Sequence, residues 1–415
     1  MRAKRDFQRD IEMNNAAKIT RREMLKRSAG FGLLGLLPGK TLWGDAGMLV
    51  EGIGLPDWAV DEIRDGVARY RAWKGADMTV AFPLVTDIHS HVAATPSGRD
   101  WSDAKSHVLF QRAIAREIGA DFLANLGDLD LDVDILGDAP PMDKVWAVID
   151  DYKKLYAHEG CPVLFAMGNH DHAKKRFSSR QFGDAFNRGI NGGTAARLHL
   201  SEDGTWGYLD LTDKRFRAVF LNTSDEGYLG FSARQMQDLS DALSSAGEGW
   251  HVAVLQHANI PHFIASWRRF IDDGNFKRSG IEMQMIEDFA NHRGDLVQGF
   301  HNPPIRGQFG GVKWDFAKSR ANLVGVFQGH LHAESYLKYA KVNYVIRPGY
   351  GTIPRDCLCG EWRDPKFDKN GNFVYDCSKS MMIDLVAIKP EKRQVHVFRI
   401  GFGGPESELE YVYGG

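Results

Sequence analysis

The sequence predicts an α/β fold in which buried strands alternate with helices. Short apolar runs bounded by turn residues recur from residue 78 onward, and segments with helical periodicity separate them. Alternation of this kind is typical of a sheet with helices packed on it. The 415 residues are 43% hydrophobic and 26% charged, as in ordinary globular proteins. A chain of this length buries roughly three quarters of its unfolded surface, so its core needs no disulfide to fold.

Five apolar runs are expected to form buried strands, because each is short and is followed by turn residues. They span residues 82–86, 122–126, 163–167, 252–256 and 323–328. Helices are expected at residues 102–119, 142–158 and 232–247, the last with a good cap at each end. Later strands, spaced like antiparallel neighbours, are expected at residues 343–348, 381–389 and 394–400.

Each of the five runs ends in side chains that can bind a metal ion. In chain order, the endings are Asp87-Ile88-His89, Gly127-Asp128, Gly168-Asn169-His170-Asp171, His257 and Gly329-His330-Leu331-His332. A lone Asp or His after a strand is commonly a turn residue or a helix cap. Five in succession are hard to explain as turns, and ligands of α/β sheets bind beyond the carboxyl ends of the strands. Residues two apart in an extended segment point to the same side, so Asp87 and His89 can act together.

These five blocks, in this order, resemble those of the calcineurin-like metallophosphoesterases over about residues 78–332. The resemblance implies a four-layer α/β/β/α sandwich, with two mixed sheets packed together and helices outside. It also implies two divalent metal ions that share one ligand, Asp128. The first ion would be held by Asp87, His89, Asp128 and His332. The second would be held by Asp128, Asn169, His257 and His330.

The ligand types indicate which metals and which substrates would suit this site. Carboxylate, imidazole and amide ligands without thiolate favour Mn, Fe or Zn. Purple acid phosphatases carry a tyrosine three residues after the bridging Asp; Leu131 holds that position here, so a tyrosinate–iron site is not expected. Two divalent ions and two carboxylates leave an excess of about two positive charges, which favours a phosphate dianion. Metal ions roughly 3.5–4 Å apart can activate a bridging water for in-line phosphoryl displacement.

His170 and Asp171 are the candidate catalytic residues beside the metal ligands. The leaving alkoxide needs a proton, and His170 can supply it as a general acid. Asp171 is expected to orient the His170 ring and to favour its protonated form. The alternative for His170 is a packing role beside the ligands. The sequence does not identify the residues that bind the rest of the substrate.

The predicted function is hydrolysis of phosphoric esters by a metal-bridging hydroxide, with phosphomonoesters as the expected substrates. A phosphodiesterase acting on nucleotides or lipid head groups needs the same metal core and differs in the loops around the leaving group. A metal-stabilised binding scaffold without turnover is the alternative of another class. A serine hydrolase or a zincin is not expected, because the sequence has neither Gly-x-Ser-x-Gly nor His-Glu-x-x-His.

Residues 1–46 are expected to be a twin-arginine export signal. Thr20-Arg21-Arg22-Glu23-Met24-Leu25-Lys26 is similar to the twin-arginine motif. An apolar stretch follows at residues 29–37, and Gly44-Asp45-Ala46 has the small residues of a cleavage site. We therefore expect a periplasmic or secreted protein that engages the twin-arginine machinery. The alternatives are a basic, frayed terminus or a short membrane anchor.

The remaining chain divides into a leading segment and one large domain. Residues 47–77 are expected to be a linker and a helix, and residues 78–415 the catalytic domain, with an insertion at about 258–322. Basic and aromatic residues of the insertion suit a substrate cap, although an insertion with its own small core fits equally well. The net charge of −2 argues against a nucleic-acid footprint, and nothing indicates an oligomeric state.

The four cysteines leave two interpretations open. Cys161 is expected to be a small buried hydrophobe at the start of a core strand. Cys357 or Cys359 can pair with Cys377 in an oxidising compartment, because an Asn-Gly hairpin signal lies between them. The alternative is that these three residues stay as thiols.

Overall fold

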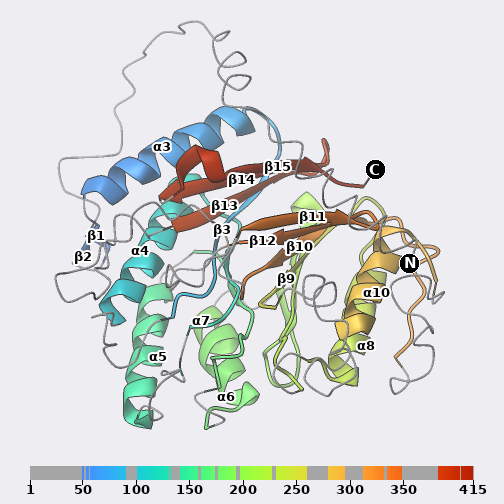
Figure 1. Cartoon of the computed structure of the whole chain (residues 1–415), viewed down its shortest axis with the longest axis horizontal. Coiled ribbons are helices and arrows are strands. Elements are labelled where there is room, and N and C mark those ends of the chain that lie inside the picture. Colours follow the sequence, from blue (N-terminus) through green and yellow to red (C-terminus); the bar gives the residue numbers. More distant parts are fainter. Residues whose placement is uncertain are drawn as a thin grey trace, which may run out of the picture. The chain divides into compact units, whose positions relative to one another are not determined.

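Two mixed β-sheets packed face to face form the centre of the computed structural model (Figure 1). The structure describes residues 49–50, 53–55, 57–89, 101–129, 131, 141–157, 160–172, 176–192, 197–226, 230–258, 279–294, 312–330, 334–347, 382–401 and 403–414. The expected export signal at residues 1–46 and the three cysteines after residue 350 lie outside these ranges.

The first sheet has six strands in the order β15-β14-β13-β3-β4-β5. Their bounds are Val80–Val85 for β3, Leu123–Asn125 for β4, Val163–Phe165 for β5, Met382–Lys389 for β13, Gln394–Gly401 for β14 and Leu409–Val412 for β15. β3, β4 and β5 run parallel, whereas β13 pairs antiparallel with both β3 and β14. The carboxyl ends of β3, β4 and β5 therefore meet at one edge of this sheet.

The second sheet has seven strands in the order β11-β12-β10-β9-β8-β7-β6. Their bounds are Leu198–Leu200 for β6, Gly207–Leu211 for β7, Phe216–Phe220 for β8, His251–Gln256 for β9, Asn322–Gln328 for β10, Ser335–Tyr339 for β11 and Val342–Ile346 for β12. β8, β9, β10 and β12 run parallel, while β6, β7 and β11 are antiparallel to their neighbours. Four parallel strands thus end at one edge of this sheet too.

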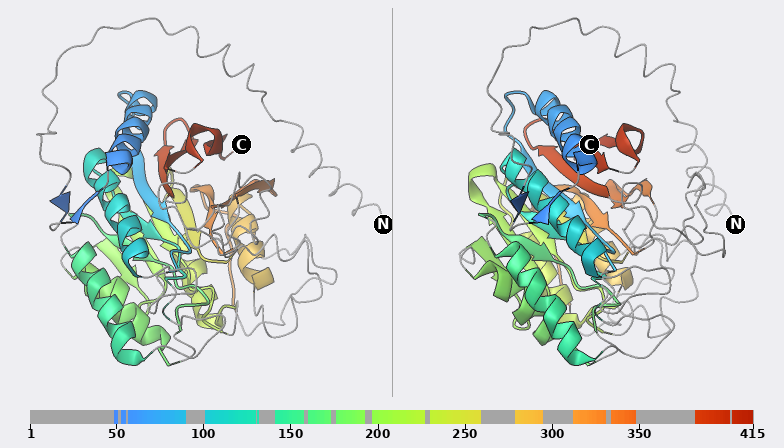
Figure 2. Two further views of the ribbon diagram at one scale, coloured as in Figure 1. Left: turned by 60° about the vertical axis from the view of Figure 1, so that its left-hand side comes forward. Right: turned by 90° about the vertical axis from the view of Figure 1, so that its left-hand side faces the viewer.

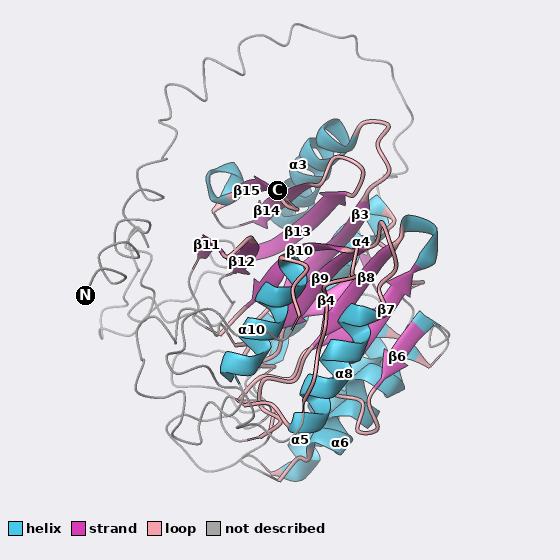
Figure 3. Ribbon diagram, turned by 90° about the vertical axis from the view of Figure 1, so that its right-hand side faces the viewer, coloured by secondary structure: helices cyan, strands magenta, loops and turns pink. Residues whose placement is uncertain are grey.

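Helices cover the outer face of each sheet, which confirms the predicted four-layer α/β/β/α sandwich. The six-stranded sheet is covered by α3 (Asp57–Lys74), α4 (Trp101–Ile118) and α5 (Met142–Tyr156) (Figure 2). The seven-stranded sheet is covered by α8 (Ala233–Ser244) and α10 (Ser279–Ala290) (Figure 3). Minor elements are β1 (Leu49–Val50), β2 (Ile53–Gly54), α6 (Ser179–Gly183), a π-helical turn at Asp184–Arg188 and α7 (Gly189–Asn191). None of the described helices has the length and apolar character needed to cross a bilayer.

The core has three layers because successive strand residues point to opposite faces of a sheet. On β3, Phe82 and Leu84 face the other sheet, whereas Ala81 and Val85 face the helices. The Phe82 ring stacks on Phe122 with a centroid separation of 4.3 Å and meets Phe327 of the second sheet edge-on at 6.0 Å. Burying such a side chain stabilises the fold by about 1.5–3 kcal/mol, so these aromatic contacts hold the sheets together.

The five strands that were expected to carry the site are confirmed as β3, β4, β5, β9 and β10. The three expected helices are confirmed as α4, α5 and α8, and Ser232 caps α8 by accepting the N–H of Gln235. One expectation about topology was wrong: residues 343–348 do not lie beside the two later strands. They form β12, which pairs with β10 and β11 in the other sheet.

The expected leading helix and part of the expected insertion both contribute to the main layers. α3 packs on β14, where Tyr70 meets Phe398 edge-on. Arg69 Nε of α3 also donates to Glu408, which directly precedes β15, at 2.9 Å. Part of the expected insertion forms α10, which packs in the same apolar cluster as α8. Cys161 is half-buried at the edge of the core rather than fully buried.

Two glutamate side chains of α10 are buried in the core beside the seven-stranded sheet. Glu282 is 1% exposed and Glu287 is 3% exposed. Burial raises the pKa of each carboxyl group to about 8, because a charge is poorly solvated there. Both groups are therefore protonated in the folded chain at neutral pH, whereas they would be ionised in the unfolded chain.

We predict that the free energy of unfolding falls as pH rises from 4.5 to about 8, because the folded chain retains protons that the unfolded chain has lost. Each acid contributes at most about 1.4 kcal/mol per pH unit. Glu282→Gln removes one contribution, so its stability relative to the wild type should increase with pH. Urea unfolding at pH 5, 6.5 and 8 measures this difference. Glu391→Gln, on an exposed turn, is the control; a Glu282→Gln difference that does not change with pH would contradict the prediction.

Candidate metal centre

The predicted metal ligands lie on loops that follow the parallel strands of both sheets. Asp87 and His89 follow β3, and Asp128 follows β4. The segment Asn169-His170-Asp171 follows β5. His257 directly follows β9, and His330 lies two residues after β10. His332 lies outside the described residues.

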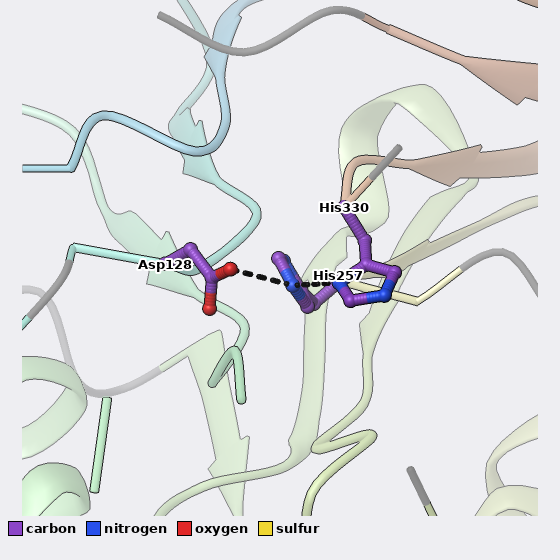
Figure 4. Close-up of side chains that lie close together, drawn as sticks. All are labelled: Asp128, His257 and His330. Carbon is purple, nitrogen blue, oxygen red and sulfur yellow. Dashed lines mark hydrogen bonds and ion pairs between the residues drawn. The ribbon is translucent and has the colours of Figure 1, made fainter. Parts of the chain in front are cut away.

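The imidazole of His257 lies at the centre of one ligand cluster. Its Nε2 atom is 3.2 Å from Asp128 Oδ2, 3.1 Å from Asn169 Oδ1 and 3.0 Å from His330 Nδ1. Figure 4 shows Asp128, His257 and His330 pointing toward one another from three separate elements. His257 is completely buried, so this contact is made away from solvent.

The backbone fixes which nitrogen of His257 faces the cluster. Its Nδ1 atom is 2.9 Å from the carbonyl oxygen of Leu126. A carbonyl oxygen only accepts, so Nδ1 carries the hydrogen and donates it. In the neutral ring Nε2 then presents a lone pair, as do the oxygens of Asp128 and Asn169 around it. Lone pairs that converge in this way need a cation between them, either a proton on Nε2 or a metal ion.

A second cluster shares Asp128 with the first. Ligand atoms of Asp87, His89 and Asp128 all lie within 4.8 Å of one another, as do those of Asp128, His257 and His330. Asp87, His89 and Asp128 are at most 7% exposed. Two clusters of carboxylate and imidazole donors with one common carboxylate match the chemistry of a pair of borderline divalent ions. The donor set present therefore fits the metal ions that the motifs imply.

The charges in the cluster are strongly coupled. Burial opposes the charged form of Asp128, but the charge and hydrogen bond of His257 hold the pKa of Asp128 well below its usual range. Burial likewise opposes a charge on His257, yet the carboxylates of Asp128 and Asp87 outweigh it and raise the pKa of His257 to about 9. Without a metal ion, the proton on His257 thus supplies the positive charge that these buried carboxylates need.

Strained backbone conformations present the ligands. Asp87, His89, Asp128 and His330 have φ angles of 51°, 46°, 51° and 69°, in the left-handed region. That conformation costs a residue with a side chain roughly 1–2 kcal/mol. Such strain is retained where the surrounding structure holds it, typically at functional sites. Backbone bonds do so here: His89 N–H donates to Asp128 O at 3.0 Å, and Asp87 N–H donates to Gly127 O at 2.9 Å.

Two glycines of the motifs allow the loops after β4 and β5 to touch backbone to backbone. Gly127 has φ 93°, and a Cβ there would lie 2.5 Å from the backbone nitrogen of Gly168. A Cβ on Gly168 would overlap the carboxylate of Asp128. Only glycine fits at either position without moving a metal ligand.

Asp171 has different contacts from those predicted. Its Oδ2 accepts the backbone N–H groups of Gly168 at 2.8 Å and Asp128 at 3.1 Å, and its Oδ1 accepts that of Leu129 at 2.8 Å. The carboxylate therefore joins the loops after β4 and β5 instead of orienting the His170 ring. Burial and the negative charge of Asp128 raise the pKa of Asp171 well above its usual range. A cation in the clusters would offset that repulsion.

His170 lies beside the cluster of Asp87, His89 and Asp128. Its backbone N–H donates to Asp128 Oδ1 at 2.9 Å, and its ring centroid is 5.6 Å from that of His89. The residue is half-buried, unlike Asp128, which is fully buried. This position is compatible with proton transfer to a group bound at the clusters.

Sequence reasoning missed one positioning residue, Thr86. Its hydroxyl lies 2.5 Å from Asp87 Oδ2, which also accepts the backbone N–H of His330 at 2.9 Å. This carboxylate oxygen thereby links the loop after β3 to the loop after β10 in the other sheet. The only signal in the sequence was that Thr86 directly precedes a predicted ligand.

Comparison with known proteins finds likeness in structure only. No protein-family model matches the chain, and no curated protein matches it. A dimetal phosphatase from Danio rerio is 11% identical with a TM-score of 0.47, over 80% of this chain and 99% of that one. A purple acid phosphatase from seeds of yellow lupin, Lupinus luteus, is 10% identical with a TM-score of 0.43, over 81% and 54% of the two chains. A putative 5′-nucleotidase from Staphylococcus aureus is 11% identical with a TM-score of 0.35, over 75% and 51%. At these values the likenesses do not establish an activity.

We predict that Asp128→Asn abolishes binding of two divalent ions per chain, because both clusters contain Asp128. His330→Gln should reduce the bound metal from two ions to one, because His330 belongs to one cluster only. Elemental analysis after gel filtration measures this ratio, with Asp213→Asn, on an exposed turn, as the control. Two ions retained by Asp128→Asn would show that the clusters do not share this ligand.

Proposed function

We propose that the protein is a dinuclear, metal-dependent hydrolase of phosphoric esters. The observation that carries the proposal is the pair of buried carboxylate–imidazole clusters that share Asp128. When bound there, two divalent ions supply Lewis acidity and an activated water for in-line displacement at phosphorus. Thiolate is not among the donors, which supports Mn, Fe or Zn as the ions.

The residues around the clusters support such a reaction. His257 and Asp128 come from different sheets and fix the distance between the two halves of the site. Thr86 and the His330 backbone hold one oxygen of Asp87, which limits how its carboxylate can rotate. His170, half-buried beside the clusters, is placed to donate a proton to the oxygen of the leaving alcohol.

Charge balance supports phosphomonoesters as the substrate class. Two divalent ions bring four positive charges, and the carboxylates of Asp87 and Asp128 cancel two of them. The remaining charge of about two matches a phosphomonoester dianion better than a singly charged diester. Residues 259–278 and 295–311 of the expected insertion lie outside the described residues.

We also propose that residues 1–46 direct export through the twin-arginine route. The order of the Arg21-Arg22 pair, the apolar stretch and the small residues at 44–46 supports this. Twin-arginine substrates cross the membrane folded, which suits an enzyme that binds its metal ions before export. The protein would then act in the periplasm or outside the cell.

The function is tested by assaying the metal-loaded chain against p-nitrophenyl phosphate, bis-p-nitrophenyl phosphate and alkyl phosphomonoesters. We expect metal-dependent turnover, with monoesters preferred, that is abolished by chelation and by Asp128→Asn. His170→Ala should keep its metal ions but lose about 10²–10⁴-fold in kcat for alkyl esters, and less for p-nitrophenyl phosphate, whose leaving group needs no proton. His199→Ala, exposed on β6, is the control. Two bound ions without turnover of any ester would favour the binding scaffold instead.

Export is tested by fusing residues 1–47 to a reporter that is active only outside the cytoplasm. We expect export that is lost when Arg21 and Arg22 are both replaced by lysine, because the translocation machinery recognises the arginine pair. A single Arg27→Lys variant is the control. Equal export by the double-lysine variant would contradict the assignment.

A further inference from the structure

A cavity lies at the opposite end of the seven-stranded sheet from the metal ligands. It has a volume of about 370 Å³. It is lined by Glu248, Gly249, Ala290, His292, Arg320, Ala321, Asn322, Leu323, Lys341, Arg393 and Gly414. Gly249 precedes β9, and Asn322 begins β10, so the cavity lies at the amino ends of these parallel strands.

This cavity is separate from the metal centre. Eight residues along β9 separate Gly249 from His257, and eight along β10 separate Asn322 from His330. At about 3.3 Å per residue, the two sites are roughly 25 Å apart. A ligand in one cannot reach the other.

Positive charge predominates in the cavity lining. Among the described residues of the lining, Arg320, Lys341 and Arg393 face a single carboxylate, that of Glu248. Among the described residues, none of these three cations forms an ion pair. Burial lowers the pKa of His292, which also lines the cavity. The positive charges of Arg320 and Lys341 lower this pKa further. An anion in the cavity would therefore meet excess positive charge of about two units.

Backbone carbonyl oxygens accept hydrogen bonds from the two guanidinium groups. Arg320 Nη1 donates to the carbonyl oxygens of Ala317 at 3.2 Å and Ser319 at 2.7 Å. Arg393 Nη1 donates to the carbonyl oxygen of Gly414 at 3.0 Å. Each guanidinium group keeps further N–H donors for a ligand. Side chains fixed in this way lose less entropy when they bind.

Three cavity residues occupy turn positions that ordinarily favour glycine or asparagine. His292, Lys341 and Arg393 have φ angles of 53°, 66° and 51°. Lys341 is in the two-residue turn between β11 and β12, where an Asn-Gly pair is favoured. A side chain at such a position is strained relative to glycine. Backbone strain of this kind clusters at functional sites.

We propose that this cavity binds a small molecule that carries a phosphate group, as a second anion site separate from the metal centre. Two guanidinium groups and an ammonium group suit the oxygens of a phosphate, because arginine donates two parallel hydrogen bonds to it. The excess charge of about two matches a phosphate dianion. A concave site of this size fits a small molecule better than an extended polyanion.

The test counts phosphate ions bound by the full, metal-loaded chain, using calorimetric titration at constant ionic strength. The wild type should bind one more phosphate than the Arg320→Ala/Arg393→Ala double variant, and each single variant should weaken that site at least about 10-fold. Lys341→Gln should also weaken it, whereas Lys338→Ala, exposed on β11 of the same hairpin, should not. Methylphosphonate in place of phosphate, which has no phosphoester bond for the metal centre to hydrolyse, distinguishes a ligand with an organic group from the free phosphate ion.

Equal phosphate stoichiometry and affinity in the wild type, the double variant and Lys341→Gln would overturn the proposal. So would a loss in Lys338→Ala as large as that in Lys341→Gln, because the effect would then be general surface charge. The proposal does not depend on hydrolase activity. The readout is a difference between variants with an intact metal centre, so failure of one proposal leaves the other standing.

Discussion

The whole site depends on the contacts that the buried imidazole of His257 makes with both sheets. Its Nδ1 donates to Leu126 in the loop after β4 of the first sheet, while the ring itself follows β9 of the second. Its Nε2 meets Asp128 and His330, one from each sheet. The two sheets are therefore joined at their carboxyl ends by a group that is stable only with a cation beside it. Packing of the two sheets at this edge therefore depends on the presence of a cation.

Several residues of this site have conformations or contacts that destabilise the fold locally. Four ligand residues have left-handed backbone conformations, and Gly127 and Gly168 allow two loops to approach to backbone contact. Asp171 is buried near Asp128 although like charges repel, because three backbone N–H groups bind it. The aromatic and aliphatic layer between the sheets, centred on Phe82, supplies the stability that offsets these costs.

Parallel strands give the seven-stranded sheet two chemically different edges. Carboxyl ends present His257 and His330 to the clusters, and amino ends present Arg320 and Asn322 to a basic cavity. In an antiparallel sheet, alternate strands would mix the two kinds of end. The parallel centre of the sheet therefore allows an anion-attracting cavity and a cation-binding cluster to coexist at opposite edges.

Sequence alone determined the five strands that precede the candidate ligands, and the ligand types, because a short apolar run that ends in Asp or His can be recognised without knowledge of its neighbours. It did not predict β6, β7, β8, β11 or β15. It did not determine that residues 343–348 join the second sheet, since strand pairing depends on distant contacts. Nor did it determine the contacts of Asp171 with three backbone amides, or the role of Thr86 beside Asp87. The basic cavity could not be predicted from the sequence either, because Arg320, Lys341 and Arg393 come from three separate connecting segments. Only tertiary structure decides which turns meet, because that choice rests on packing between sheets rather than on any local pattern.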